Sequence, residues 1–388
     1  MQNNFLQSFE QELFDNIVPF WSKLKDSENG GFYGYVQNDG SVIKNADKGI
    51  LLQCRIVWFF SALYEIKPQK QNYELAKHGL EYLKNYCFDQ DGLVVWLTDY
   101  QGKKTDKTKH IYYQSFALYA LSRYYQSFLD DSVKKMADSL YNLIEKNYYD
   151  SYGYKEQLDN MPNRLADCGI ACDRTMNALL HLLEAYTQYY IACKNNNAKD
   201  SLKRLLDIFH SKIYDSQKQR FEVFFDNEMN SVTDYYSFGH DIEAAWLLDL
   251  AAKSIADEQY ILKISKLTDA ICKKVYNTAF DENALMFAKI NNYQDSNKVW
   301  WVQAEGVLGF FKNFIRSGNL DYLSASKKLL DYIKKYFINH HTGEWFWLVD
   351  NENRPDYSKP LVCNWKCPYH NGRMCIEMIK ELRCSQIN

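Results

Sequence analysis

Six residues with hydrogen-bonding or acid–base side chains recur along the chain at nearly constant spacing. They are Arg55, Tyr112, Asn177, His240, Trp301 and Arg373. The intervals between them are 57, 65, 63, 61 and 72 residues, a period typical of architectures built from repeated supersecondary units. Each residue stands near the start of an apolar run with helical periodicity. Polar groups at the heads of six apolar helices predict a polar pocket on which the helices converge.

One of these residues belongs to a polar stripe. Asn177, His181 and Glu184 are spaced i, i+4 and i+7, so they share one face of a predicted helix. A single histidine on an apolar helix is usually a hydrogen-bonded core residue. Three polar groups on one stripe favour a site instead.

A second histidine begins the next apolar helix. His240 and Glu243 follow Gly239 at i and i+3 in the first helical turn, where acidic residues are also common for helix stability alone. A glycine at this point lets the backbone approach another group closely. The spacing suggests that Glu243 orients or tunes His240.

The segment from Asn364 to Arg373 is the densest cluster of side chains that could bind or react. It contains Trp365, Lys366, His370 and Arg373 within ten residues. Such a mixture is unusual in a loop without function, so we expect it to line the pocket.

The remaining candidates lie on other repeats. Trp301 and Glu305 share a helix face, and the adjacent Trp300 must point elsewhere, so one tryptophan lines the pocket and the other packs in the core. Arg55 precedes an apolar run, and a buried arginine needs acceptors, which substrate oxygens can supply. Tyr112 lies in a similar polar and aromatic cluster.

Composition narrows the class of protein. The chain has 388 residues, 46% hydrophobic and 24% charged, with net charge -3. This balance gives no electrostatic footprint for nucleic acid, and no apolar run reaches the length of a membrane span. The 31 Tyr, 22 Phe and 9 Trp suit core packing and also the apolar faces of sugars.

Cysteine usage and the N-terminus favour a reducing compartment. The ten cysteines are scattered, and nothing near Met1 resembles a signal peptide. We therefore expect a cytoplasmic protein with free thiols. The pairs Cys168/Cys172 and Cys363/Cys367 have the spacing C-x3-C, but zinc would require them to converge, so we expect no metal.

Helical periodicity dominates the rest of the sequence. We predict twelve helices, at residues 8–24, 50–66, 72–87, 110–128, 131–147, 173–193, 199–213, 240–255, 258–276, 299–316, 321–337 and 370–382. Short aromatic, strand-like segments beside Gly, Asn or Asp turns lie between them. Six two-helix units predict an all-α (α/α)6 barrel with short β-hairpins and loops over the cleft. An open solenoid of helix pairs is the alternative. No linker appears, so we expect one catalytic domain over residues 1–388.

The motifs of other enzyme classes are absent. The sequence has no P-loop, no G-x-G-x-x-G, no H-E-x-x-H and no G-x-S-x-G. The candidates that are left are histidines, carboxylates, an arginine and aromatic residues. This set suits acid–base chemistry on an uncharged polar substrate.

Several of these motifs together resemble a known family. They are Asn29–Gly34, Lys48–Gly49 with Arg55, Thr175–Ala178, Gly239–Glu243, Trp300–Glu305 and Trp365–Arg373. These segments are similar to those of the cellobiose 2-epimerases, within the N-acylglucosamine 2-epimerase superfamily, and the similarity runs from about residue 8 to 380. The resemblance implies an (α/α)6 barrel and epimerisation at C2 of the reducing-end glucose of β-1,4-linked disaccharides such as cellobiose and lactose. It implies no metal or redox cofactor.

The resemblance also implies residue roles. His240 and His370 would form the acid/base pair, Arg55 would stabilise the enediolate oxygen, and Glu243 would support His240. Substrate-binding residues would be Tyr112, Asn177, His181, Trp301, Glu305, Trp365 and Arg373. One histidine serving both faces of C2 is an open alternative to two. We expect a monomer or a weak homodimer.

Other functions are compatible with the same fold. An N-acylglucosamine 2-epimerase or a mannose aldose–ketose isomerase would share the enediol chemistry. A glycoside hydrolase would need two carboxylates beside the scissile bond, and Glu184, Glu243 and Glu305 could supply them. A sugar-binding protein without catalysis is the remaining alternative.

Overall fold

Twelve helices account for most of residues 2–158 and 169–384, the part of the chain that the computed structural model describes. Four of them contain a wider π-helical segment, labelled η. The helices are α1–η1–α2 (Gln2–Gln11, Glu12–Ile17, Val18–Ser22), α3 (Ile50–Ile66), α4–η2 (Lys70–Tyr82, Leu83–Cys87), α5 (Ile111–Phe128), α6 (Asp131–Tyr148), α7 (Met176–Cys193), α8–η4 (Asn196–Ile208, Phe209–Ile213), α9 (Phe238–Ser254), α10 (Glu258–Ala279), α11 (Trp300–Ser317), α12–η5 (Leu320–Tyr332, Ile333–Phe337) and α13 (His370–Cys384).

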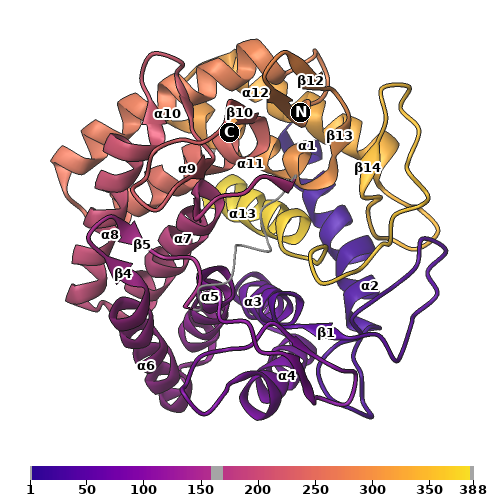
Figure 1. Cartoon of the computed structure of the whole chain (residues 1–388). Helices are drawn as coiled ribbons and strands as arrows, with labels where there is room; N and C mark the ends of the chain where they lie inside the picture. The colour runs from indigo at the N-terminus through magenta and orange to yellow at the C-terminus, as the bar shows by residue number, and fades with distance from the viewer. Residues whose placement is uncertain (1, 159–168, 385–388) are drawn as a thin grey trace.

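The helices form two concentric rings (Figure 1). The inner ring is α3, α5, α7, α9, α11 and α13, in which each helix packs against the next and α13 packs against α3. Each inner helix also packs against an outer helix: α4, α6, α8, α10 and α12 follow α3 to α11 in order, and α1 covers α13. The contact between α13 and α3 closes the ring. The predicted (α/α)6 barrel is therefore confirmed over the open solenoid.

Burial explains which helices are inside. Every residue of α3 from Ile50 to Leu63 is buried, as expected for a helix that is apolar on all sides. The outer helix α8 instead buries only one face, which includes Leu202, Leu205 and Leu206. The inner helices thus form the core, and the outer helices shield it from solvent.

Side-chain caps fix where many helices begin. The outer helices α6, α8, α10 and α12 are capped by Asp130, Asn195, Asp257 and Asn319. These residue types accept hydrogen bonds from the free N–H groups of a first turn. On the inner ring, His110, Thr175 and Ser237 cap α5, α7 and α9. Three inner helices therefore begin with a polar side chain at the same end of the barrel.

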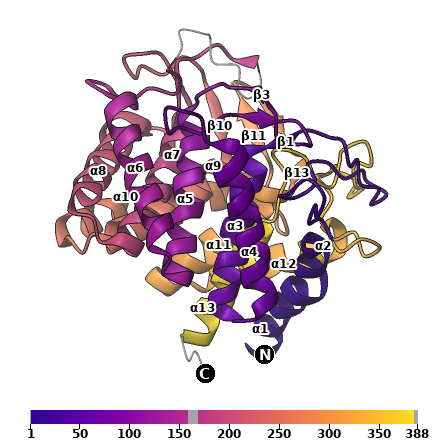
Figure 2. The same ribbon diagram turned by 90° about the horizontal axis from the view of Figure 1, so that it is seen from below.

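Short antiparallel ladders gather at that end (Figure 2). The strands are β1 (Lys48–Gly49), β2 (Leu97–Thr98), β3 (Lys104–Asp106), β4 (Tyr149–Asp150), β5 (Gly153–Tyr154), β6 (Arg174–Thr175), β7 (Tyr214–Asp215), β8 (Arg220–Phe221), β9 (Phe224–Phe225), β10 (Tyr235–Ser237), β11 (Ala288–Ile290), β12 (Tyr293–Asp295), β13 (Lys298–Val299) and β14 (Leu348–Val349). Strands β1, β6, β10 and β13 run directly into α3, α7, α9 and α11. The predicted hairpins thus hold the heads of the inner helices in place.

The seam between the first and last repeats is tied by buried polar contacts. The indole of Trp345 donates to Glu12 at 2.6 Å, and the indole of Trp21 donates to Glu344 at 2.5 Å. Lys366 Nζ also lies 2.8 Å from Glu344 Oε1, with both side chains fully buried. Burial raises the pKa of Glu12 to about 7. These contacts join the N-terminal helix to the segment before α13.

Two expectations from composition can be compared with the described residues. Among residues 2–158 and 169–384, none of the helices combines the length and apolar character that a membrane crossing requires. The described cysteines are free thiols. Cys168, the first cysteine of the C-x3-C pair with Cys172, lies outside the described residues.

Candidate active site

A cavity of about 480 Å³ opens at the strand end of the barrel, a size typical of small-molecule sites. Five of the six repeat residues line it: Arg55, Tyr112, Asn177, His240 and Trp301. His181, Glu243, Trp365 and His370 line it as well. The cavity is thus where the sequence pattern predicts a polar pocket.

His370, at the first turn of α13, is held by a carboxylate. Its Nδ1 lies 2.7 Å from Glu305 Oε1. The indole of Trp246 donates to the other oxygen of Glu305 at 3.0 Å. A carboxylate at Nδ1 favours the tautomer with hydrogen on that nitrogen, which leaves Nε2 as the free acceptor. Glu305 therefore orients His370 from behind.

Arg373 forms the floor below these groups. We predict from the sequence that Arg373 and Glu305 contact the substrate, but neither is among the residues that line the cavity. The guanidinium instead donates through Nη2 to Glu243 at 2.6 Å and to Glu305 at 2.7 Å, and through Nη1 to Glu184 and Tyr369. Carboxyl groups from three helices surround Arg373, because a buried cation must be paired.

His181 is joined to the same floor from α7. Its Nδ1 lies 3.0 Å from Glu184 Oε2, which also accepts from the Tyr369 hydroxyl. Burial alone would raise the pKa of Glu184, but Arg373 and His181 lower it to about 2. Glu184 is therefore a carboxylate, and it fixes the ring of His181 as Glu305 fixes that of His370.

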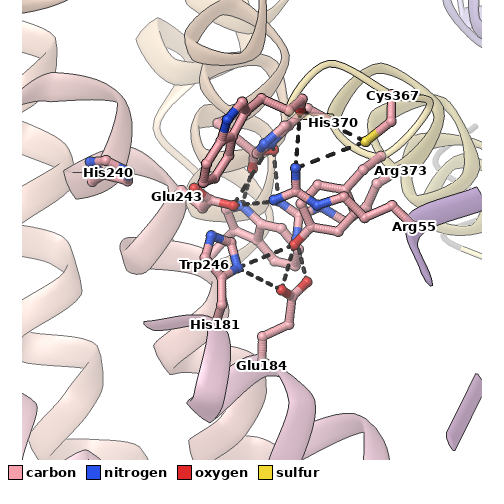
Figure 3. Close-up of polar contacts among 12 residues, drawn as sticks. Arg55, His181, Glu184, His240, Glu243, Trp246, Cys367, His370 and Arg373 are labelled. Carbon is pink, nitrogen blue, oxygen red and sulfur yellow. Dashed lines mark hydrogen bonds and ion pairs between the residues drawn. The ribbon is translucent and has the colours of Figure 1, made fainter. Parts of the chain in front are cut away.

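His240 stands apart from this network (Figure 3). Its Nδ1 lies 2.7 Å from the hydroxyl of Ser237, the residue that caps α9. Its ring packs against Trp301, with centroids 4.8 Å apart. A hydroxyl can donate to Nδ1 or accept from it, so Ser237 suits both protonation states of His240.

Glu243 does not support His240 as the sequence suggests. It lies one helical turn further along α9, and its carboxyl group faces Arg373 rather than His240. The physical reason is the buried guanidinium, which attracts Glu243 more strongly than a neutral imidazole can. Gly239 is also explained differently, because a Cβ there would lie 2.5 Å from the ring of Trp301. Gly239 makes room for Trp301.

Arg55 extends into the cavity wall from α3. It donates to the Tyr112 hydroxyl at 3.0 Å and to the carbonyl of Trp365 at 3.2 Å. The guanidinium lies 4.1 Å from the ring centroid of Phe116 and 4.5 Å from that of Tyr369. Aromatic faces stabilise a cation without neutralising it, so Arg55 keeps a full positive charge at the cavity.

Tryptophans form much of the wall beside the histidines. The Trp301 ring lies between His240 and His370, with its centroid 5.5 Å from that of His370. Trp300 is buried and meets His370 edge-on at 5.3 Å. Trp365 is 37% exposed at the rim. The expected division between a core tryptophan and a pocket tryptophan is observed only in part, because the buried Trp300 lines the cavity together with Trp301 and both contact His370.

Electrostatics keeps the three histidines neutral. Burial lowers the pKa of His240 to about 3 and that of His370 well below its ordinary value, in the latter case with the help of Arg373. Burial also lowers the pKa of His181, despite its contact with Glu184. Neutral imidazoles can accept protons, whereas imidazolium groups cannot. The cavity is thus suited to proton abstraction near neutral pH.

Several site residues escape prediction from the sequence. Ser237, Trp246 and Tyr369 each contact a histidine, a glutamate or Arg373 in the site. Tyr369 and Ser237 lie close to predicted histidines in the chain, which is the only signal available. A further pair, His110 and Glu156, lines the cavity with their side chains 3.2 Å apart.

Glu243, Glu305 and His370 lie close enough together to share a metal ion. The Arg373 guanidinium already donates to Oε1 of both glutamates. A cation in that position makes an ion-pair floor the better interpretation of the cluster.

Fold and site together define a sugar-modifying enzyme of the (α/α)6 type. Comparison with known proteins specifies the family to which it belongs. The N-acylglucosamine 2-epimerase (GlcNAc 2-epimerase) family model matches residues 31–370, so the chain belongs to that family and is a carbohydrate epimerase. Cellobiose 2-epimerase from Ruminococcus albus is 41% identical over 96% of this chain and 98% of its own.

Solved structures give the same result. The cellobiose 2-epimerase structure from Bacillus thermoamylovorans is similar with a TM-score of 0.94 at 36% identity, covering 98% of this chain and 100% of the other. A sugar epimerase from a ruminal bacterium is similar with a TM-score of 0.95 at 40% identity, covering 97% and 99%. The resemblance seen in the sequence is confirmed.

Proposed function

We propose that this epimerase inverts C2 of the reducing-end glucose in β-1,4-linked disaccharides, converting cellobiose to glucosyl-mannose and lactose to epilactose. The observation that carries the proposal is the pair of neutral histidines, His240 and His370, which lie on different helices and line the same cavity as Arg55. The full-length similarity to a cellobiose 2-epimerase supports the choice of substrate.

The chemistry begins with ring opening. The resulting C1 carbonyl makes the C2 proton acidic, and a base then removes it to give an enediolate with negative charge on O1. Arg55 stabilises this oxygen, and a fixed donor of this kind contributes roughly 3–4 kcal/mol to the transition state. A proton returned from the opposite face of C2 gives the epimer.

The two histidines divide the proton transfers. His370 is prepared as a base, because Glu305 holds the proton on Nδ1 and leaves Nε2 free. His240 lies across the ring of Trp301. It takes up a proton from solvent, delivers that proton to the other face of C2 and becomes neutral again, while His370 releases the abstracted proton to solvent. In the reverse reaction the roles exchange, which suits His240 because Ser237 can either donate to or accept from it.

Unsatisfied polar atoms on residues that line the cavity support the binding of a sugar. Among the described residues, Arg55 Nε, Asn177 Oδ1 and Glu243 Oε2 are buried without a hydrogen-bond partner. Sugar hydroxyls can donate to or accept from such atoms. Tyr112 and His181 add hydrogen-bonding groups, and Trp301 and Trp365 offer aromatic faces to the sugar rings.

The same proposal covers the organisation of the protein. The chain acts as one catalytic domain over residues 1–388, because the closed barrel takes its last inner helix from the C-terminal region. The acid, the base and the cation are all side chains, so the reaction is assigned to them without a cofactor. We propose that the protein works as a monomer or a weak homodimer.

Product analysis tests the function against its alternatives. Purified protein is incubated separately with cellobiose, N-acetylglucosamine and mannose, and the products are separated by chromatography. Glucosyl-mannose from cellobiose supports the proposal. N-acetylmannosamine from N-acetylglucosamine, fructose from mannose, or free glucose from cellobiose would each assign the protein to one of the other classes and contradict it.

A further inference from the structure

We infer that Glu243 rests as a neutral carboxylic acid and donates a hydrogen bond from its Oε2 hydroxyl to an oxygen of the reacting sugar. The inference rests on the proposed function for its sugar partner, but the protonation state can be tested without turnover. It assigns Glu243 a role different from supporting His240.

The first step is the crowding of carboxylates around one cation. Glu184, Glu243 and Glu305 all bond to the Arg373 guanidinium, and all are almost fully buried. Glu243 and Glu305 even share the same nitrogen, Nη2. Buried like charges at this separation cannot all remain ionised, so one group of the cluster keeps a proton.

The second step identifies which carboxyl group that is. Glu305 receives hydrogen bonds from Arg373, His370 and Trp246. Glu184 receives them from Arg373, His181 and Tyr369. Donors to a carboxylate stabilise its charged form. These two groups are therefore the carboxylates.

Glu243 has a much poorer set of donors. Among the described residues its Oε1 accepts from Arg373 alone, and His370 Nδ1 is 3.9 Å away. Its Oε2 is buried without a partner. Burial and the neighbouring Glu305 also raise the pKa of Glu243 well above its ordinary value. The proton of the cluster therefore belongs on Glu243 Oε2.

The third step is the direction of the donor. Glu243 lines the cavity, whereas Glu305 does not. The Oε2 hydroxyl thus belongs to a carboxyl group that lines the cavity, and the atom itself is shielded from solvent and without a partner among the described residues. A sugar oxygen that carries no hydrogen, either the carbonyl O1 or the ring oxygen, is a suitable acceptor for the Glu243 hydroxyl. A neutral acid can donate there without placing another negative charge beside the enediolate.

Infrared spectroscopy in D2O tests the protonation state directly. The difference spectrum of the wild type minus Glu243→Gln should contain the carbonyl stretch of a protonated carboxyl group near neutral pH. The difference spectrum for Glu305→Gln should contain a carboxylate band instead. A wild-type spectrum that loses only a carboxylate band on Glu243→Gln would overturn the inference. Neither result depends on epimerase activity.

Steady-state kinetics of variants at Glu243 and Glu305 tests whether Glu243 acts as a hydrogen-bond donor. Glu243→Gln keeps a donor of the same shape and should lower kcat by about tenfold, whereas Glu243→Leu, without a donor, should lower it by about 10²–10³-fold. Glu305→Gln should be as severe as Glu305→Leu, because an amide cannot accept from all of its donors. Equal losses for Glu243→Gln and Glu243→Leu would contradict the donor role.

The pH dependence of kcat/KM gives a further test, because it would not change if Glu243 had only a structural role. The wild-type kcat/KM should fall on the alkaline side as Glu243 loses its proton at its raised folded pKa. Glu305, Glu184 and His370 face Glu243 from α11, α7 and α13 and are present in both proteins. Glu243→Gln should therefore abolish this alkaline limb alone. An unchanged limb would contradict the inference.

Discussion

At the scale of single residues, the site separates groups on its walls from groups in its floor. His240, His370 and Arg55 are at the cavity, whereas Arg373, Glu184 and Glu305 lie behind them. The floor holds ring orientations and charge states that the wall residues need. This division explains why one arginine lines the cavity and the other does not.

The two histidines should each be essential. His240→Ala and His370→Ala should lower kcat by roughly 10²–10⁴-fold, the usual contribution of a positioned acid or base. Both variants should remain folded, because neither ring makes up much of the apolar core. Circular dichroism and initial-rate assays measure the two effects. Unfolding of both variants would support a structural role instead and contradict the assignment.

Arg55 should not tolerate a conservative replacement. Arg55→Lys keeps the charge but loses the planar fork that reaches Tyr112 and the Trp365 carbonyl. We expect a loss of kcat of about 10²–10³-fold with a smaller change in KM, because the charge on O1 develops mainly after substrate binds. Steady-state kinetics measures the split. A variant with near-normal kcat would show that Arg55 binds the ground state only.

The sequence predicts the wall better than the floor. His240, His370, Arg55 and Asn177 are recognisable because each sits at the head of an apolar repeat. The floor residues Glu184, Glu243, Glu305 and Arg373 are recognisable as candidates too. Their contacts with one another are not, because they come from α7, α9, α11 and α13, which are far apart in the chain. Spacing on one helix suggests that Glu243 supports His240, and only the packing of four helices reveals its attraction to Arg373.

At the scale of elements, the segment between β14 and α13 acts as a support for the site. It carries Trp365 and provides the carbonyl that holds Arg55. Lys366 anchors it by a fully buried ion pair with Glu344, and its ammonium lies 4.9 Å from the Trp300 ring centroid. Trp300 in turn contacts His370.

Loss of this anchor should destabilise the protein. Lys366→Met leaves Glu344 buried without its cation, and we expect the free energy of unfolding to fall by about 3–5 kcal/mol. Chemical denaturation measures this change. The exposed pair of Lys70 and Glu74 provides the control, since Lys70→Met should change stability by less than about 0.5 kcal/mol. Equal effects of the two substitutions would contradict the account of the anchor.

The helical elements themselves follow closely from periodicity. The helix predicted at 50–66 is α3 with the same bounds, and the other predicted helices overlap the observed ones. The N-terminal helix begins at Gln2 rather than residue 8, because Phe5 and Phe9 pack into the core although their polar neighbours obscure the pattern. The strands are two or three residues long, too short for an alternating pattern to fix their bounds.

At the scale of the whole molecule, closure of the barrel brings residues from both ends of the chain together. Glu12 on η1 accepts from Trp345, more than 300 positions later. Its folded pKa of about 7 exceeds the ordinary 4.5. The protonated form of Glu12 therefore contributes stability that is present below pH 4.5 and lost as the pH rises through 7.

Glu12→Gln should remove this dependence, because glutamine resembles the protonated acid at every pH. Calorimetry should give similar Tm values for wild type and variant near about pH 4, and a higher Tm for the variant near about pH 8. The gain should be on the order of 3 kcal/mol. A difference in Tm that is the same at both pH values would contradict the raised pKa of Glu12.

The central claim is that this barrel inverts C2 by proton exchange. NMR of cellobiose incubated with the protein in D2O tests it most directly. The account predicts that glucosyl-mannose appears with deuterium at C2 and that His240→Ala and His370→Ala abolish it. Free glucose, or cellobiose that remains unchanged and unlabelled, would contradict the account.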